Sequence, residues 1–333
     1  MSLKKSILPI IIWCILLIVL SAFDMLRDLV PVRTEGSLII LKMVRLPRIL
    51  TAIIAGGGLA IAGAQMQSIL RNPLADPHIM GISSGASLGA ALATLAGGGL
   101  AASGGILLGM SVAMASIMGA AAASLVIMAA SARFRRASTL LVFGVMLSFI
   151  VNAIITVLQS GSDAESLKIF HSWSAGSFST TSIREIGIMA IALALGGAMA
   201  LSDSKGLDII LFGDEFASLS GARPQKIRIN ALLSCCLMTG TVTAFCGPIG
   251  FVGIVAPHLA RTFWRTSAHR HIIPASFLCG STLGIAADLF SQITSAPVPV
   301  SSTMALVGIP IILYILIKRP EQTNEKRSTK DYW

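Results

Sequence analysis

The stretch PHIMGISSGASLGAALATLAGGGLAASGGILLGMSVAMASIMGAAAASLVIMAASA, residues 77–132, contains no Asp, Glu, Lys or Arg. A helix needs about 20 predominantly apolar residues to cross the hydrocarbon core of a bilayer. This stretch is too long for one crossing, and the clusters Gly97-Gly98-Gly99 and Gly104-Gly105 mark a turn within it. It therefore predicts two successive transmembrane helices, at 78–97 and 105–132.

The 333-residue chain as a whole is also rich in apolar residues and poor in charged ones. Its residues are 54% hydrophobic and only 12% charged, whereas soluble domains carry about 25% charged residues. Small residues, such as those of Gly56-Gly57-Gly58 and Gly119–Ser124, let helix backbones approach closely in lipid. The sequence thus indicates an all-α membrane protein, with a single transmembrane domain over residues 1–333. About ten transmembrane helices are predicted, at 6–23, 49–70, 78–97, 105–132, 138–159, 186–202, 228–246, 249–260 (a short one), 272–288 and 300–317.

The basic residues lie between the apolar runs, where positive charge reports topology. If the N-terminus is cytoplasmic and the chain crosses ten times, 18 of the 25 Lys and Arg fall in cytoplasmic segments. Both termini and the tail 319–333 are therefore expected in the cytoplasm. The net charge of +10 does not indicate a nucleic-acid partner, because the basic residues form no stripe with interleaved aromatics. The expected surroundings are membrane lipid.

The first of four informative segments begins with Arg45-Leu-Pro-Arg48 and continues to Arg71-Asn-Pro-Leu-Ala-Asp-Pro77 and Gly81-Ile-Ser-Ser-Gly-Ala86. Arg45 and Arg48 are three residues apart at a helix start, so they project from similar faces at the membrane surface. Asn72-Pro73 and Asp76-Pro77 force a non-helical turn, because a residue before proline avoids the α region. On physical grounds alone, the two arginines could equally be interfacial anchors that snorkel toward water.

The second segment, Phe212-Gly-Asp-Glu-Phe-Ala-Ser-Leu-Ser-Gly221, is a short amphipathic stretch inside the basic loop 203–227. Asp214 and Glu215 favour a helix N-terminus, and Gly221 favours the end of that helix. A short exposed helix with an apolar side needs a partner, which is either another protein or the lipid surface.

The third segment is Gly247-Pro-Ile-Gly-Phe-Val-Gly-Ile-Val-Ala-Pro-His-Leu-Ala-Arg261, in which Gly247-Pro248 ends one helix. His258 is expected near the inner surface, as a hydrogen-bonded interfacial histidine or as a proton relay or ligand. The fourth segment runs from Pro297-Val-Pro-Val300 to Ala305-Leu-Val-Gly-Ile-Pro310. It predicts a proline-marked entry to the last helix and a kink within it.

Together these four segments closely resemble the FecCD-type permeases of ABC importers, the family that moves iron–siderophore, haem and vitamin B12 complexes. The resemblance runs from about residue 45 to 318, and its blocks are long, ordered and correctly spaced. It implies a permease dimer, of identical or related chains, in a bacterial or archaeal cytoplasmic (inner) membrane. Two ABC ATPase subunits would dock on the cytoplasmic side and a substrate-binding protein outside. It also implies two inverted four-helix repeats, at 49–159 and 228–317, as expected for alternating access.

The resemblance also assigns candidate site residues. Arg45 and Arg48 match the external arginines that pair with carboxylates of the binding protein, and Ser138 and Thr139 fall near the cytoplasmic gate. Two departures weaken the external charge pattern, because Gln292 stands where the family often has Arg, and Ala296-Pro297 where it often has Glu. The helix that couples to the ATPase corresponds to Gly213, Asp214, Glu215, Phe216, Leu219 and Gly221.

The sequence lacks the signature motifs of other functional classes. No phosphate-binding Gly-x-x-x-x-Gly-Lys-Ser/Thr loop occurs, so a transport subunit without its own ATPase site is expected, with hydrolysis by partner subunits. Neither a His-Glu-x-x-His motif nor a nucleophile elbow indicates an enzyme. The main competitor, an ion-driven secondary carrier, usually places ionisable residues at mid-membrane, and the central parts of these spans are nearly free of them.

The sequence says less about bound metals or cofactors and about the transported cargo. The five cysteines lie inside apolar segments without the paired spacing of a zinc site, so neither a metal site nor a cofactor is predicted. The predicted path of small and apolar side chains suits a bulky chelate whose selection is left to the binding protein. An iron complex, with a siderophore or haem, is the first choice on family frequency, and cobalamin is the alternative.

Overall fold

The computed structural model describes residues 3–26, 39–95, 106–134, 136–293 and 298–318. This part of the chain is helical and contains no strand. The π-helical turn η1 covers Leu41–Arg45 and runs directly into α3. The α-helices are α1 (Leu3–Leu26), α3 (Leu46–Ile69), α4 (Ile82–Leu95), α5 (Ile106–Arg133), α6 (Ala137–Ser160), α7 (Ala164–Ser174), α8 (Ile183–Ser202), α9 (Ser204–Ile210), α10 (Asp214–Leu219), α11 (Pro224–Cys246), α12 (Val252–Trp264), α13 (His269–Ser291) and α14 (Val300–Lys318).

Each of the ten predicted spans coincides with a helix, and seven of these helices are long and apolar enough to cross a membrane. The other three are α4, α12 and α14, of which α4 has 14 residues and α12 has 13. At 1.5 Å per residue these two are only about 20 Å long, shorter than a hydrocarbon core of about 30 Å. The all-α multi-pass architecture is confirmed, while ten full crossings remain a prediction.

Three further helices lie outside these spans, α7 between α6 and α8, and α9 and α10 between α8 and α11. The predicted helix at 212–221 is confirmed as α10, with Asp214 and Glu215 in its first turn. Gly221, with φ +79°, follows the last turn. The amide of Ala222 donates to Ala217 and that of Gly221 to Ser218, which is the Schellman pattern that ends helices at glycine.

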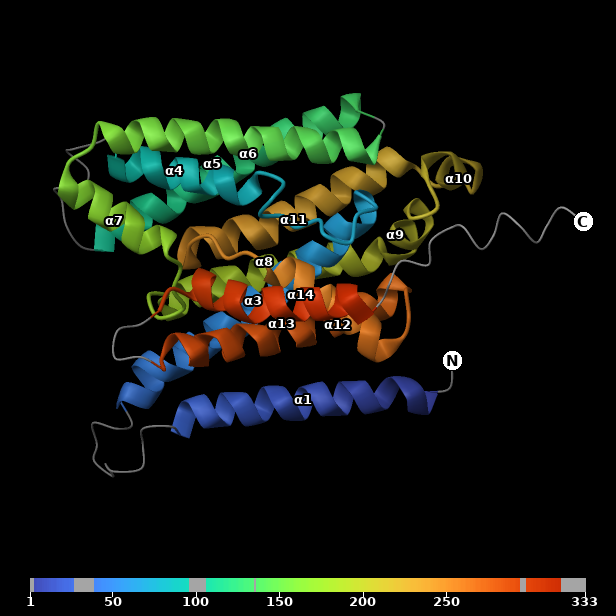
Figure 1. Ribbon diagram of the computed structural model, residues 1–333, viewed down its shortest axis with the longest axis horizontal. Helices are drawn as coiled ribbons and strands as arrows, with labels where there is room; N and C mark the ends of the chain where they lie inside the picture. Colours follow the sequence, from blue (N-terminus) through green and yellow to red (C-terminus); the bar gives the residue numbers. More distant parts are fainter. Residues whose placement is uncertain (1–2, 27–38, 96–105, 135, 294–297, 319–333) are drawn as a thin grey trace, which may run out of the picture.

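The long helices lie side by side along the longest axis of the molecule (Figure 1), with α1 at one edge and α6 at the opposite edge. Helix α3 lies between them and packs against α8, α11, α12 and α13. It is buried from Pro47 to Ile69 with few interruptions. A second group is formed by α4, which packs on α5 and α6. The core is therefore arranged around α3, and the outer helices keep apolar side chains on the surface.

The first predicted repeat range contains α3 to α6, and the second contains α11 to α14. The N-terminal end of α1 and the C-terminal end of α14 lie at the same end of the bundle as α9 and α10 (Figure 1). Helix α7 lies at the other end. The inverted relation of the repeats and the side of the membrane that each end faces stay predictions.

Close helix contacts depend on paired glycines, as the small-residue pattern predicts. A Cβ atom added to Gly56 of α3 would lie 2.2 Å from the carbonyl oxygen of Gly280 in α13. One added to Gly63 would come as close to the backbone of Gly253 in α12. Because the obstacle is backbone in both cases, no side-chain rotation relieves the clash. These two contacts set the distances at which α12 and α13 pack on α3.

Replacing Gly56 by Ala is therefore expected to destabilise the bundle by about 1–3 kcal/mol or more, the usual cost of overpacking. Gly58→Ala is the matched control on the same helix, since its Cβ would meet only side-chain atoms at 3.8 Å or beyond. That change should be neutral or should stabilise by up to about 1 kcal/mol through helix propensity. Melting temperatures in detergent measure both. Equal shifts for the two variants would contradict the close approach.

Candidate functional site

Helix α10 is attached to the bundle through one carboxylate. Asp214, its first residue, pairs with the Nη2 atoms of Arg228 on α11 at 2.9 Å and of Arg71, just after α3, at 3.4 Å. Arg228 is only 3% exposed, whereas the other two side chains are about one-third exposed. The sequence placed Arg71 in the first informative segment and both arginines among the basic residues that report topology, but nothing in it paired them with Asp214.

The outer side of α10 is apolar and uncovered. Leu219 is 89% exposed and Phe212, just before the helix, is 74% exposed. The ring of Phe212 packs against that of Phe216 with centroids 5.4 Å apart, while Ala217 faces inward and is fully buried. The helix thus presents aromatic and aliphatic side chains away from the bundle, at the end that α9 also occupies (Figure 1).

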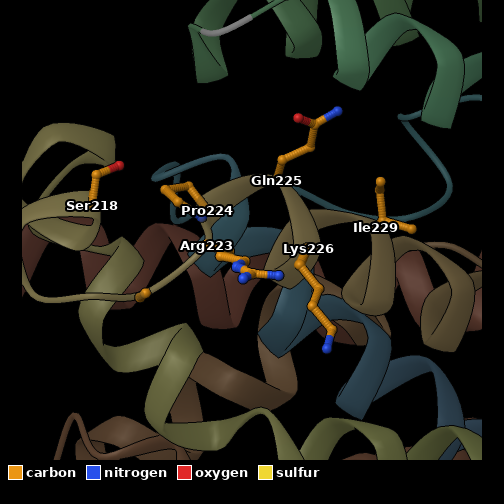
Figure 2. Close-up of a pocket in the computed structure, with 7 residues that line it drawn as sticks. Ser218, Arg223, Pro224, Gln225, Lys226 and Ile229 are labelled. Carbon is orange, nitrogen blue, oxygen red and sulfur yellow. The ribbon is translucent and has the colours of Figure 1, made fainter.

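Two concavities flank α10. The larger, of about 1370 Å³, lies between α10, the end of α3 and the turn from α5 to α6, and its lining includes Arg136, Ser138 and Arg228. Ser138 therefore lies beside α10, and Thr139 is exposed next to it. The smaller, of about 550 Å³, lies at the start of α11 and is lined by Ser218, Arg223 and Lys226, among others. Figure 2 shows Gln225 and Lys226 pointing in opposite directions from this first turn.

At the other end of the bundle, Arg48 forms an ion pair with another helix of the same chain. Its Nε donates to both carboxylate oxygens of Asp288 on α13, at 2.8 and 2.9 Å. Asp288 is 1% exposed and Arg48 is 17% exposed. Arg45 donates from Nη1 to the backbone carbonyls of Asp24 and Met25. Both arginines thus tie helices together, and Arg48 does so through its Nε–H group.

Gln292, one of the two departures from the family pattern, belongs to the same network. Its amide donates to Asp288 at 2.9 Å and to the carboxylate of Asp24 at 3.2 Å. It therefore supplies donors to two carboxylates that lie close together at the ends of α1 and α13. The second departure, Ala296-Pro297, lies outside the described residues.

The two strongest sequence blocks meet inside the bundle. Asp76, from the turn after α3, accepts the amide of His78 at 3.0 Å and lies against Gly253 at the start of α12. Burial raises the pKa of the Asp76 carboxyl, against the opposing influence of His78 and of the backbone amides of His78 and Phe251. Phe251 has φ +70°, a conformation that a bulky residue adopts only when its surroundings impose it.

Helix α12 also carries a proline inside it, Pro257. Proline has no N–H, so the carbonyl of Gly253, four residues earlier, loses its helical donor. The side-chain amide of Gln67 on α3 donates to this carbonyl at 3.1 Å, and Arg261 donates to the Gln67 oxygen at 2.5 Å. His258 contacts the carbonyl of Ile254 through Nδ1 at 2.9 Å, which agrees with a hydrogen-bonded histidine.

A Ser-His-Asp series links α3, α13 and α9, and sequence reasoning missed it. Ser68 Oγ lies 2.5 Å from Nε2 of His269, whose Nδ1 lies 2.5 Å from Asp208. Ser68 is fully buried and His269 is 1% exposed, so no substrate carbonyl can reach the hydroxyl. The series therefore connects helices and does not form a hydrolytic site. Its members come from three distant segments, and their spacing in the sequence carries no signal.

These features define a multi-pass membrane protein with an exposed apolar helix at one end and charge-paired helices at both ends. The FecCD transport family model matches residues 6–318. The chain therefore belongs to the FecCD family of ABC importer permeases, which are transport components and not enzymes. The resemblance found in the sequence is confirmed.

Relatives and a solved structure agree with this family. The chain is 32% identical to the hemin transport system permease protein HmuU of Yersinia pestis, over 84% of its own length and 83% of HmuU. It is 30% identical to the cobalamin import system permease protein BtuC of Halobacterium salinarum, over 86% of its length and 75% of BtuC. A metal-chelate type ABC transporter in an inward-facing conformation superposes with a TM-score of 0.83 at 27% identity, covering 92% of this chain and 98% of that one.

The Arg48–Asp288 pair is expected to stabilise the contact between α3 and α13. Arg48→Gln leaves a buried carboxylate without its cation, and breaking a buried pair in this way costs about 3–5 kcal/mol. Arg48→Gln combined with Asp288→Asn removes both charges and should recover most of that loss. Melting temperatures of the two variants in detergent test the pairing. A double variant no more stable than Arg48→Gln alone would show that the pair does not hold α3 to α13.

Proposed function

We propose that the chain is the permease subunit of an importer that carries an iron complex, as a siderophore or haem, with cobalamin as the alternative cargo. The observation that carries the importer role is α10, a helix held by Asp214 with its apolar side uncovered. Such a side is stabilised when a partner buries it. In an ABC importer that partner is an ATPase subunit, and an ion-driven carrier has no use for such a helix.

The end of the bundle that carries α9 and α10 is the cytoplasmic end in this proposal. The bias of 18 basic residues among 25 toward this side supports it. Arg223 and Lys226 add positive charge beside α10, so the groove of the ATPase is expected to be apolar with acidic residues at its rim. Two permease chains, identical or related, form the path between them, and two ATPases dock below.

In this mechanism the ATPases close when they bind ATP and displace α10. The concavity of about 1370 Å³, which joins α10 to Arg136 and Ser138, is the part of the chain that this displacement reaches first. Ser138 and Thr139 then act at the cytoplasmic gate. Neither residue has to ionise, because the gate works by steric closure and hydroxyl contacts.

A substrate-binding protein docks at the opposite end, with Arg45 and Arg48 as contacts for its carboxylates. The ion pair with Asp288 uses only the Nε–H group of Arg48, so its two amino groups can take a further carboxylate. The variant Arg48→Gln with Asp288→Asn separates docking from folding. It should bind the substrate-binding protein more weakly, with a smaller salt dependence, while remaining folded.

Loss of the apolar side of α10 tests the ATPase contact. Leu219→Ser combined with Phe212→Ser should reduce co-purification of the ATPase by at least about tenfold, the effect of losing about 1.4 kcal/mol or more of binding energy. Both side chains are exposed, so the fold should persist. Ile183→Ser, at a site 70% exposed at the start of α8, is the control and should leave co-purification unchanged. Wild-type co-purification with the double variant would refute the assignment.

Uptake assays in proteoliposomes with the cognate ATPase and binding protein test the cargo. Labelled ferric siderophore, haem and cobalamin are supplied separately at equal concentration. ATP-dependent uptake of an iron complex is expected, with cobalamin left outside. Cobalamin uptake alone would establish the alternative cargo, and uptake without ATP would refute an ATPase-coupled importer.

A further inference from the structure

We propose that the Asp214–Arg228 ion pair transmits the displacement of α10 to α11, and so positions the bundle for transport. This inference rests on the proposed docking of an ATPase at α10. It assigns Asp214 a positioning role, distinct from the apolar contacts of Phe212 and Leu219. The carboxylate faces the bundle, whereas those two side chains face away from it.

The two arginines on Asp214 are not equivalent. Arg228 is buried and lies 2.9 Å from the carboxylate, whereas Arg71 is one-third exposed and lies at 3.4 Å. Short charge-assisted hydrogen bonds are the stronger ones, and exposed ion pairs contribute little. Asp214 therefore moves with α11, and the contact to Arg71 is the one that yields when α10 shifts. Arg71 lies just beyond α3 and has φ +50°, a conformation that is uncommon for a residue other than glycine.

Helix α11 is suited to carry this movement through the bundle. Its 23 residues span about 34 Å at 1.5 Å per residue, from the level of α10 to Gly247. Along this length it packs on α3, α4, α5 and α8. Near its far end Thr243 lies 3.3 Å from Ser83 of α4. A shift at Arg228 therefore reaches both groups of helices.

The loop around α10 offers few other rigid attachments. Ala217 is the buried residue within α10. Its methyl group packs against neighbours but forms no directional interaction such as a hydrogen bond or an ion pair. Gly213 and Gly221, which flank the helix, both have positive φ and permit the chain to bend. The ion pair is thus the directional link from α10 to a long helix.

The test uses the complete complex in proteoliposomes and compares Asp214→Asn with Asp203→Asn. Asp203 accepts from Asn230 of α11 at 2.8 Å but lies outside α10, so it is a matched carboxylate on the same helix partner. Two quantities are measured, co-purification of the ATPase and cargo transported per ATP hydrolysed. Asp214→Asn should keep co-purification within about twofold and lower transport per ATP by about tenfold, the size of a typical coupling between sites. Asp203→Asn should change neither.

Wild-type transport per ATP in Asp214→Asn would overturn the proposal, as would parallel loss of transport and co-purification. If Asp214→Asn does not fold, Asp214→Leu with Arg228→Met replaces the pair by apolar side chains, an exchange that buried pairs often tolerate. That variant should assemble and remain uncoupled, and normal coupling in it would equally overturn the proposal. Failure of the α10 docking proposal would appear separately, as co-purification that is insensitive to Leu219 and Phe212.

Discussion

The backbone of α3 lies against α13 and α12 at distances that only glycine permits, and the arrangement of the other helices depends on these contacts. Gly56 meets Gly280, and Gly63 meets Gly253, without room for a methyl group between them. In lipid, apolar bulk gives helices little reason to associate, so van der Waals contact at short range supplies the attraction. The central position of α3 follows from this requirement.

The same close packing places polar groups of α3 next to a backbone carbonyl of α12 that has no helical hydrogen-bond donor. Gln67 is one turn beyond Gly63, and its amide satisfies the carbonyl that Pro257 leaves without a donor. An unsatisfied carbonyl inside a membrane costs several kcal/mol. The short helix α12 can therefore begin inside the protein, with Asp76 at its start, because α3 and the turn after it supply partners.

Charge pairing ties the bundle at both ends, with different consequences. Asp288 is buried and engages Arg48 and Gln292 in a network within the helix layer. Asp214 is partly exposed and lies on a six-residue helix whose outer side is apolar. The first arrangement favours a fixed contact between α3 and α13. The second joins a helix whose surface suits a protein partner to α11, whose 23 residues run through the bundle.

The sequence by itself determined the membrane environment, the family and the position of α10, because these depend on composition, on unbroken apolar runs and on local capping signals around Asp214 and Gly221. It also indicated that small residues pack the helices. Only the tertiary structure decided that Arg48 pairs with Asp288, that Asp214 pairs with Arg228, and that Ser68, His269 and Asp208 form one series. Those partners lie between 14 and 240 positions apart, and nothing in their local sequence specifies which helices meet. The hydropathy of a segment does not record its neighbours either, so it did not show that α12 can begin inside the protein, where Gln67 of α3 satisfies the carbonyl of Gly253.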